Sequence, residues 1–155
     1  MLQAGKMRGG MCMLLTIDVG NTNITMGVFA EEFLTGMFRM TTKRPRTSDE
    51  YGFTICGILE HRSIDPKAIE DVIIASVVPD IMHSLTSGVI KYLHTTPVIV
   101  SADSDTGIRV NTDNPSRTGP DRIVNAVAGY AISKGPAIVV DFGTATTYDL
   151  IGPDG

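Results

Sequence analysis

A short motif occurs twice in this chain of 155 residues, and it constrains the possible fold more than any other feature of the sequence. In both copies an apolar segment ends in an aspartate, and the aspartate is followed by one residue, a glycine and then small polar side chains. The copies lie at residues 17–22 and 140–145. Each copy predicts a strand, a tight turn and a second strand, because glycine lets the backbone turn sharply and approach a ligand closely.

The two predicted turns are candidate phosphate-binding sites. The backbone N–H groups of such a turn and the hydroxyl groups of threonines can donate hydrogen bonds to phosphate oxygens. An aspartate repels an anion, so Asp18 and Asp141 are each placed to hold a cation that bridges to the phosphate. A single Asp-x-Gly is more often an ordinary hairpin turn. Two copies, one opening each of two domains, favour a cleft that holds a nucleotide's phosphates from both sides.

The apolar pattern around these motifs predicts an α/β chain in which three strands are followed by alternating helices and strands. We expect strands at residues 14–17, 24–29, 33–40, 71–78, 97–100, 137–140 and 147–151, with those at 71–78 and 137–140 fully buried. We expect helices after the Thr47 and Glu50 capping box, after Pro79 and after Gly119. Tyr51 is expected in the core, and His83 and His94 on the surface.

A polar segment from Ser101 to Pro115 separates the two copies and suggests a domain boundary. We expect a disordered extension at residues 1–12, a first domain at 13–114 and the start of a second domain at 115–155. The net charge of −4 argues against nucleic-acid or anionic-membrane partners. No apolar run approaches the roughly 20 residues that a membrane-spanning helix needs. Cys12 and Cys56 are most simply reduced thiols, which is consistent with a cytoplasmic protein.

The two motifs resemble the phosphate motifs of the acetate and sugar kinase, chaperone ATPase and actin superfamily; they read Asp18-Val19-Gly20-Asn21-Thr22-Asn23 and Asp141-Phe142-Gly143-Thr144-Ala145-Thr146. A further segment is similar to the Gly-x-Asp-Arg motif of type III pantothenate kinases, namely Asn114-Pro115 followed by Gly119-Pro120-Asp121-Arg122. Residues 46–51 and 75–79 also look like that family, and the resemblance covers residues 13–155. It implies an actin-like, ribonuclease H-like α/β fold, in which a mixed sheet is flanked by helices, with the first domain complete and the second only begun.

The resemblance implies an ATP-dependent kinase that converts pantothenate to 4'-phosphopantothenate, the first step of coenzyme A biosynthesis. Asp121 corresponds to the family's proton acceptor for the pantothenate hydroxyl. The implied pantothenate contacts are Gly119, Pro120, Asp121 and Arg122, with Arg122 a partner for a carboxylate. The implied ATP contacts are Asp18, Val19, Gly20, Asn21, Thr22, Asn23, Ile24, Thr25 and Thr144. Asp18 would organise Mg²⁺, and Asp141 would hold a monovalent cation, K⁺ or NH₄⁺.

The family's substrate pocket is shared between protomers, so the resemblance also implies a homodimer. Family members are longer than this chain, so a complementary C-terminal chain is a second expected partner. Their glycine-rich adenosine segment and a later substrate threonine have no counterpart here, and Thr112 stands where the family often has tyrosine. These departures leave the activity of the 155-residue chain alone in question.

Several alternatives remain open at this point. Asp121 could simply stabilise the dipole of the helix that it begins, and Arg122 could be a solvated helix residue. Lys43, Arg44 and Arg46 are too few to indicate a phosphate patch, and a solvated turn is expected there. The chain could be an inactive fragment or a non-catalytic regulatory module of the same fold. A kinase of the same superfamily that acts on a sugar or a carboxylate is a weaker alternative.

Overall fold

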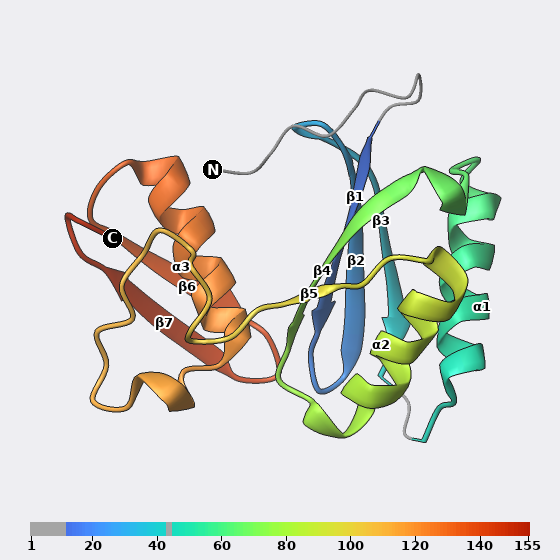
Figure 1. The fold of residues 1–155 in the computed structure, drawn as a ribbon. Helices are drawn as coiled ribbons and strands as arrows, with labels where there is room; N and C mark the ends of the chain where they lie inside the picture. Colours follow the sequence, from blue (N-terminus) through green and yellow to red (C-terminus); the bar gives the residue numbers. More distant parts are fainter. Residues whose placement is uncertain (1–11, 43–44) are drawn as a thin grey trace.

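The computed structural model describes residues 12–42 and 45–155, which form two β-sheets with helices beside and between them (Figure 1). The first sheet has the strand order β3-β2-β1-β4-β5. It comprises β1 (Met13–Val19), β2 (Asn23–Ala30), β3 (Phe33–Thr41), β4 (Ile69–Ser76) and β5 (Val98–Ile99). The first three strands are antiparallel neighbours, whereas β4 runs parallel to β1 and β5 parallel to β4. The sheet is therefore mixed.

Two helices, α1 (Ser48–His61) and α2 (Pro79–Leu93), cover one face of this sheet (Figure 1). The alternating side chains of β1 and β2 that point toward the helices are all buried: Leu15, Ile17, Val19, Ile24, Met26 and Val28. They pack in one cluster with Tyr51, Ile55 and Leu59 of α1 and with Leu85 and Val89 of α2. This cluster is the main hydrophobic core, and Tyr51 belongs to it as the sequence predicts.

The predicted capping box begins α1. The Glu50 backbone N donates to Thr47 Oγ1 at 3.2 Å, and the Thr47 backbone N donates to Glu50 Oε2 at 2.7 Å. These bonds satisfy two N–H groups that have no partner within the helix itself. Pro79 occupies the first turn of α2, where a missing N–H is harmless.

The other face of the first sheet contacts α3 (Pro120–Ser133), which is followed by a second, two-stranded sheet of β6 (Ala137–Phe142) and β7 (Thr146–Ile151). Ile123 of α3 is buried in a small cluster with Ala75 of β4 and Val100. The same helix contacts β6 and β7, so it lies between the two sheets (Figure 1). Two short 3₁₀ turns complete the order, Pro66–Ala68 and Pro115–Arg117. The expected domain boundary after residue 114 precedes α3 and stays a prediction.

The strands differ from the sequence prediction in three places. The strand expected at 71–78 is Ile69–Ser76, and it is not fully buried, since Asp71 is exposed at its start. The strand expected at 97–100 is reduced to Val98–Ile99, and both of these residues are exposed. The strand expected to be fully buried at 137–140 is not. Its residues alternate between half-buried and exposed, and Ile138 and Val140 are exposed. The reason is that α3 covers only one side of the β6–β7 hairpin.

The remaining predictions concern the chain's surface and its ends. His83 and His94 are exposed, and Cys12 and Cys56 are free thiols, as expected. The disordered extension expected at residues 1–12 lies outside the described residues, apart from Cys12. Within the described ranges, every helix is too short or too polar to cross a bilayer.

Candidate functional site

The two repeated motifs form turns of closely similar geometry. In the first, the Gly20 backbone N donates to the Asn23 carbonyl at 2.9 Å, and in the second the Gly143 N donates to the Ala145 carbonyl at 3.2 Å. The second turn is one residue shorter, since Val19 pairs with Ile24 whereas Phe142 pairs with Thr146. Both turns therefore follow the same design, in which the aspartate is the last residue but one of a strand and the turn begins at the glycine.

The fold brings these turns together although they are far apart in the sequence. Thr22 Oγ1 and Thr144 Oγ1 lie 3.2 Å apart and share a hydrogen bond across a separation of 122 residues. Both side chains are exposed, so their hydroxyl groups are available to a ligand. Thr42 braces the first turn, because its backbone N donates to the Thr22 carbonyl at 2.9 Å and its hydroxyl donates to the Gly20 carbonyl at 2.8 Å.

Two carboxylates from other elements lie close enough to Asp18 for their negative charges to act on it. Asp18 lies in β1, Asp121 in the first turn of α3 and Asp141 in β6. Part of Asp18 reaches solvent, but the protein removes enough water from its carboxylate to raise its pKa, and the negative charges of Asp121 and Asp141 raise that pKa further. The site thus concentrates negative charge that a bound cation would offset.

The described carboxylates do not by themselves complete a cation site. Across residues 12–42 and 45–155, no three histidine, cysteine, aspartate or glutamate side chains converge closely enough to hold a metal ion by themselves. Oxygen ligands of aspartate suit Mg²⁺ and K⁺, and Mg²⁺ usually keeps several waters and binds phosphate oxygens as well. The residues present fit a cation that is shared with a phosphate. Asp141 is already oriented for such a role, because Asn125 Nδ2 donates to its Oδ2 at 3.2 Å.

The Gly119-Pro120-Asp121-Arg122 segment forms the N-terminus of α3. Gly119 is the N-cap, and Pro120 opens the first turn. A Cβ atom at Gly119 would collide with Asp121 Oδ1, so the glycine lets this carboxylate fold back over the helix start. Asp121 Oδ1 also accepts a hydrogen bond from the Arg122 backbone N at 2.9 Å. The helix dipole favours a negative charge at this position, so the structural role and a role in proton transfer are compatible.

Arg122 is held by a residue that the sequence analysis did not single out. Its Nε donates to Asp149 Oδ1 at 2.5 Å, and its Nη2 donates to the Tyr148 carbonyl at 3.0 Å. Asp149 lies on the inner face of β7 and is only 8% exposed. Arg122 is therefore not a solvated helix residue. The only signal for Asp149 in the sequence is an acidic residue at an inward position of an apolar strand, and that pattern does not name its partner.

The other predicted site residues divide into two groups. The side chains of Val19 and Ile24 are fully buried in the main core, so only their backbones can face a ligand. Asn21, Thr22, Asn23 and Thr144 are exposed, and Thr25 is half-buried. The side chain of Thr112 is occupied locally, since its hydroxyl lies 3.1 Å from that of Thr118.

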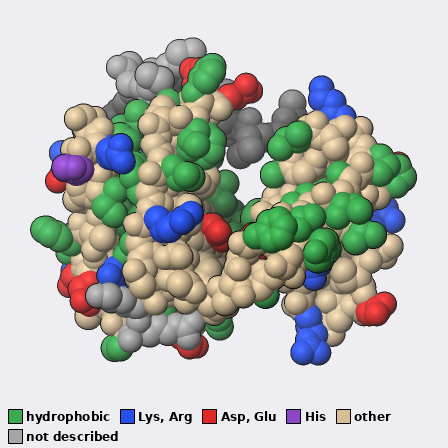
Figure 2. Space-filling model, turned by 180° about the vertical axis from the view of Figure 1, so that it is seen from behind, with side chains coloured by type: hydrophobic (Ala, Val, Ile, Leu, Met, Phe, Trp, Pro, Cys, Tyr) green, Lys and Arg blue, Asp and Glu red, His purple; other side chains and the backbone are tan. Residues whose placement is uncertain are grey.

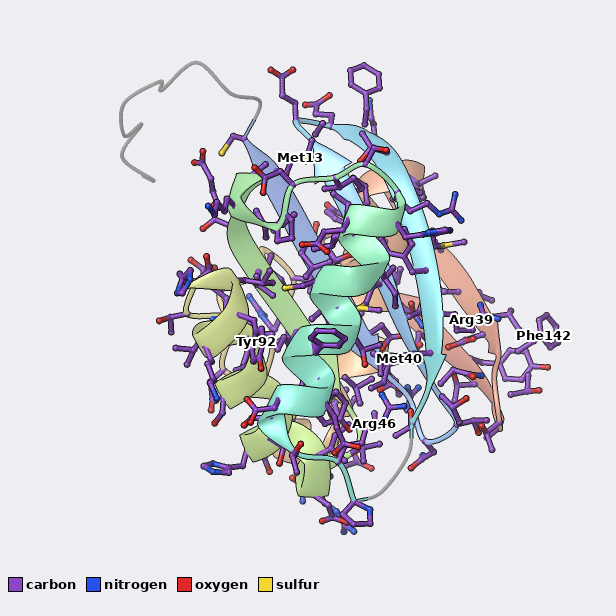
Figure 3. The ribbon with its side chains drawn as sticks, turned by 90° about the vertical axis from the view of Figure 1, so that its right-hand side faces the viewer. Met13, Arg39, Met40, Arg46, Tyr92 and Phe142 are labelled. Carbon is purple, nitrogen blue, oxygen red and sulfur yellow. The ribbon has the colours of Figure 1, made fainter. Side chains whose placement is uncertain are left out.

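The basic segment before α1 differs in part from the prediction of a solvated turn. Arg46 is half-buried, and its guanidinium lies over the Tyr51 ring at 5.7 Å from the ring centroid (Figure 3). Its alkyl chain and charged group thus cover the core. Lys43 and Arg44 lie outside the described residues. A shallow hollow of about 730 Å³ between β3 and α1 contains no residue of the two turns.

Comparison with known proteins supports the resemblance noted in the sequence. The family described as type III pantothenate kinase matches residues 14–155. A type III pantothenate kinase of Agathobacter rectalis is 54% identical over 143 residues, which is 92% of this chain and 55% of that protein. One from Halalkalibacterium halodurans is 48% identical over 139 residues, or 90% of this chain and 55% of that protein. The chain spans about half the length of the curated relatives it matches.

Solved structures with much lower identity share the fold alone. A reductive activator for a corrinoid, iron-sulfur protein has a TM-score of 0.59 at 12% identity, over 96% of this chain and 30% of that one. A protein from Sinorhizobium meliloti assigned as a 2-dehydro-3-deoxygalactonokinase has a TM-score of 0.52 at 12% identity, over 91% and 50%. The expected actin-like α/β class, a mixed sheet flanked by helices, is confirmed. On the family match and the two close relatives, the chain belongs to the type III pantothenate kinase family.

Proposed function

We propose that this chain provides the phosphate-binding turns and the catalytic aspartate of an ATP-dependent pantothenate kinase. The reaction is direct phosphoryl transfer from ATP to the hydroxyl group of pantothenate, in which ADP leaves and 4'-phosphopantothenate forms, the first intermediate on the route to coenzyme A. The observation that carries this proposal is the contact between the turns. Thr22 and Thr144 share a hydrogen bond, and the carboxylates of Asp121 and Asp141 act on that of Asp18.

The turns would bind the phosphates of ATP. The residues proposed to contact ATP are Asp18, Val19, Gly20, Asn21, Thr22, Asn23, Ile24, Thr25 and Thr144. Val19 and Ile24 would contribute backbone groups, because their side chains are buried. Phosphoryl transfer needs little covalent chemistry from the protein, so positioning and charge neutralisation account for most of the rate.

Asp121 would accept the proton of the pantothenate hydroxyl as the hydroxyl oxygen attacks the terminal phosphorus. Gly119, Pro120 and Arg122 would line the pantothenate site with it. The Arg122 guanidinium is already bonded to Asp149 through Nε, so only its outer edge would meet a substrate carboxylate. Asp149 would fix the orientation of that edge.

Asp18 would hold Mg²⁺, and Asp141 would hold K⁺ or NH₄⁺. These cations, when bound, supply positive charge that offsets the negative charge of the phosphates. The raised pKa of Asp18 fits this assignment, since a carboxylate destabilised by its neighbours gains most from a cation. We further propose that the protein is a cytoplasmic homodimer. A complementary C-terminal chain would complete the pantothenate and adenosine sites.

The direct test is detection of 4'-phosphopantothenate by mass spectrometry, with ATP and Mg²⁺ and with or without K⁺. The intact mass of each sample shows which polypeptides it contains. We expect potassium-dependent turnover when the C-terminal part of a relative is present, and turnover at least about 100-fold lower for Asp121→Asn. A sugar or carboxylate phosphorylated in place of pantothenate would overturn the substrate assignment. No turnover with or without the C-terminal part would favour a non-catalytic module.

A further inference from the structure

The strand β3 lies at an open edge of the first sheet. Within residues 12–42 and 45–155 its one strand partner is β2, so the backbone groups along its other edge pair with no strand there. Phe33, Leu34 and Met37 of this strand are 74%, 53% and 61% exposed. Figure 2, seen from behind, shows hydrophobic side chains on the surface of the half of the molecule that contains the first sheet. An exposed apolar edge strand favours pairing with another strand.

A β-bulge interrupts the alternation of side chains along β3. The register with β2 shifts by one residue after Val28, and Thr35 is the extra residue that this shift leaves in β3. In a regular strand, residues an odd number of positions apart point to opposite faces of the sheet. Two such residues on either side of the bulge point to the same face instead.

The neighbours of β3 show which side chains share a face. Phe38 is buried in the main core beneath α1, so it points to the helix face. Leu34 points to the opposite face, where it lies over Gly27 of β2. Alternation from Phe38 places Met37 and Arg39 on that opposite face, and Figure 3 shows Arg39 on the side of β3 that is away from α1. Leu34 and Met37 therefore share one face of the strand.

These faces allow β3 to pair with a second copy of itself in one antiparallel register, with the twofold axis just after Thr35. Leu34 then lies opposite the partner's Met37, and both point to the same face, as residues directly opposite each other in an antiparallel pair must. Phe33 likewise lies opposite the partner's Phe38 on the helix face. Without the bulge both pairs would point to opposite faces, so the bulge selects this register.

The same register brings opposite charges together at both ends of the strand pair. Glu32, in the turn between β2 and β3, lies opposite the partner's Arg39, and the twofold axis repeats this pair. Both side chains are exposed, and within the described ranges neither forms an ion pair in the single chain. Opposite charges that face each other across a strand pair stabilise it, whereas like charges destabilise it. The edge of β3 is thus complementary in charge to itself.

We propose that β3 binds the β3 strand of a second copy of this chain, in the antiparallel register that places Glu32 opposite the partner's Arg39. In this interface Phe33 reaches the partner's Phe38, which lines the shallow hollow between β3 and α1. Phe53 lines the same hollow and is 75% exposed, so the partner's phenyl ring covers apolar surface that the single chain leaves open.

The β3 interface is separate from the homodimer proposed above, in which the substrate pocket is shared. No residue of β3 belongs to the proposed ATP or pantothenate sites, so pairing along β3 needs neither ligand. It also leaves both turns of each copy open.

An exchange of charges tests this register. Sedimentation equilibrium of the 155-residue chain at low ionic strength, where exposed charges are least screened, measures the dissociation constant of the dimer. Arg39→Glu places like charges opposite each other twice in each dimer, and Glu32→Arg does the same. We expect each variant to raise the dissociation constant at least about 30-fold. The double variant restores both opposite-charge pairs and should return the constant to within about threefold of the parent's.

Arg109→Glu is the matched control, because it makes the same change of charge at an exposed residue outside the first sheet. It should leave the dissociation constant unchanged. A chain that stays monomeric at every measurable concentration would overturn the proposal. Self-association that Arg39→Glu leaves unchanged would also overturn it, because the interface would then lie elsewhere. A double variant that associates as weakly as the single variants would contradict the register.

Discussion

At the residue scale, the central feature is a group of three carboxylates from different elements that the fold holds near one another. Asp18, Asp121 and Asp141 come from two strands and a helix. Loss of water around the Asp18 carboxylate raises its pKa, and the negative charges of Asp121 and Asp141 raise it further. Such an arrangement lowers stability when the site is empty, and it is common where a protein binds a cation or a reacting group. The site thus favours ligand binding over the stability of the free chain.

This repulsion predicts a pH-dependent effect of Asp18→Asn. A raised pKa means that the folded chain binds the Asp18 proton more tightly than the unfolded chain does. The free energy of unfolding therefore falls as pH rises from the ordinary aspartate pKa to the raised one, and stays lower above it. Asp18→Asn removes this decrease, so the variant should be more stable than the parent at neutral pH and equal to it in acid.

Urea unfolding at a series of pH values, without Mg²⁺ or nucleotide, measures this difference. Asp113→Asn, at an exposed loop residue, is the matched control and should leave the stability curve unchanged. A constant offset between the Asp18→Asn variant and the parent at every pH would show that the carboxylate's charge is not the cause.

The Arg122–Asp149 pair supports a second prediction at this scale. Asp149 is buried, and within residues 12–42 and 45–155 its Oδ2 has no hydrogen-bond partner, so we expect the ion pair with Arg122 to carry its stabilisation. Arg122→Leu leaves that charge unpaired and should lower the free energy of unfolding by about 3 kcal/mol. Arg122→Leu combined with Asp149→Leu should recover much of that loss. Additive losses in thermal or urea unfolding would contradict a direct coupling.

At the scale of elements, α3 does most to shape the site. It carries Asp121 and Arg122 in its first turn, orients Asp141 through Asn125 and anchors itself on the first sheet through Ile123. One helix thus links the two sheets and positions groups from both. Because this helix contacts both β4 and the β6–β7 hairpin, it helps to hold the two turns next to each other.

The crossing of α1 and α2 is equally dependent on close packing, and it supports a third prediction. Tyr92 of α2 lies against Gly52 of α1 (Figure 3), and a Cβ atom at Gly88 would come within 2.5 Å of the Ser48 carbonyl oxygen and 3.1 Å of the Gly52 backbone N. Backbone atoms cannot move aside, so Gly88→Ala should push the helices apart and lower the free energy of unfolding by about 1–3 kcal/mol.

Gly57→Ala is the matched control, because nothing lies within 4 Å of a Cβ atom at this exposed position of α1. It should stabilise the chain by about 0.5–1 kcal/mol through helix propensity alone. Urea unfolding of both variants measures the contrast. An effect of the same sign in both would mean that helix propensity, and not the crossing, determines the result.

At the scale of the whole molecule, the sequence predicts what is local and periodic. The repeated turns, the capping box at Thr47 and the helix start at Gly119 were all readable, because each depends on residues that are close in the chain. The Arg122–Asp149 contact cannot be predicted from the sequence in this way, because its residues are 27 positions apart and the contact depends on how α3 packs against β7. Burial at β6 was misjudged for a related reason: an apolar strand looks the same in sequence whether one face is covered or both.

The most direct test of the central claim, that both turns form one phosphate site, is a titration of the ¹⁵N-labelled 155-residue chain with Mg-ATP, followed by NMR. The account predicts that the amide signals of Gly20 and Gly143 both shift and that they give the same dissociation constant. Shifts confined to one glycine, two different dissociation constants, or no shift at either turn at saturating nucleotide would contradict it.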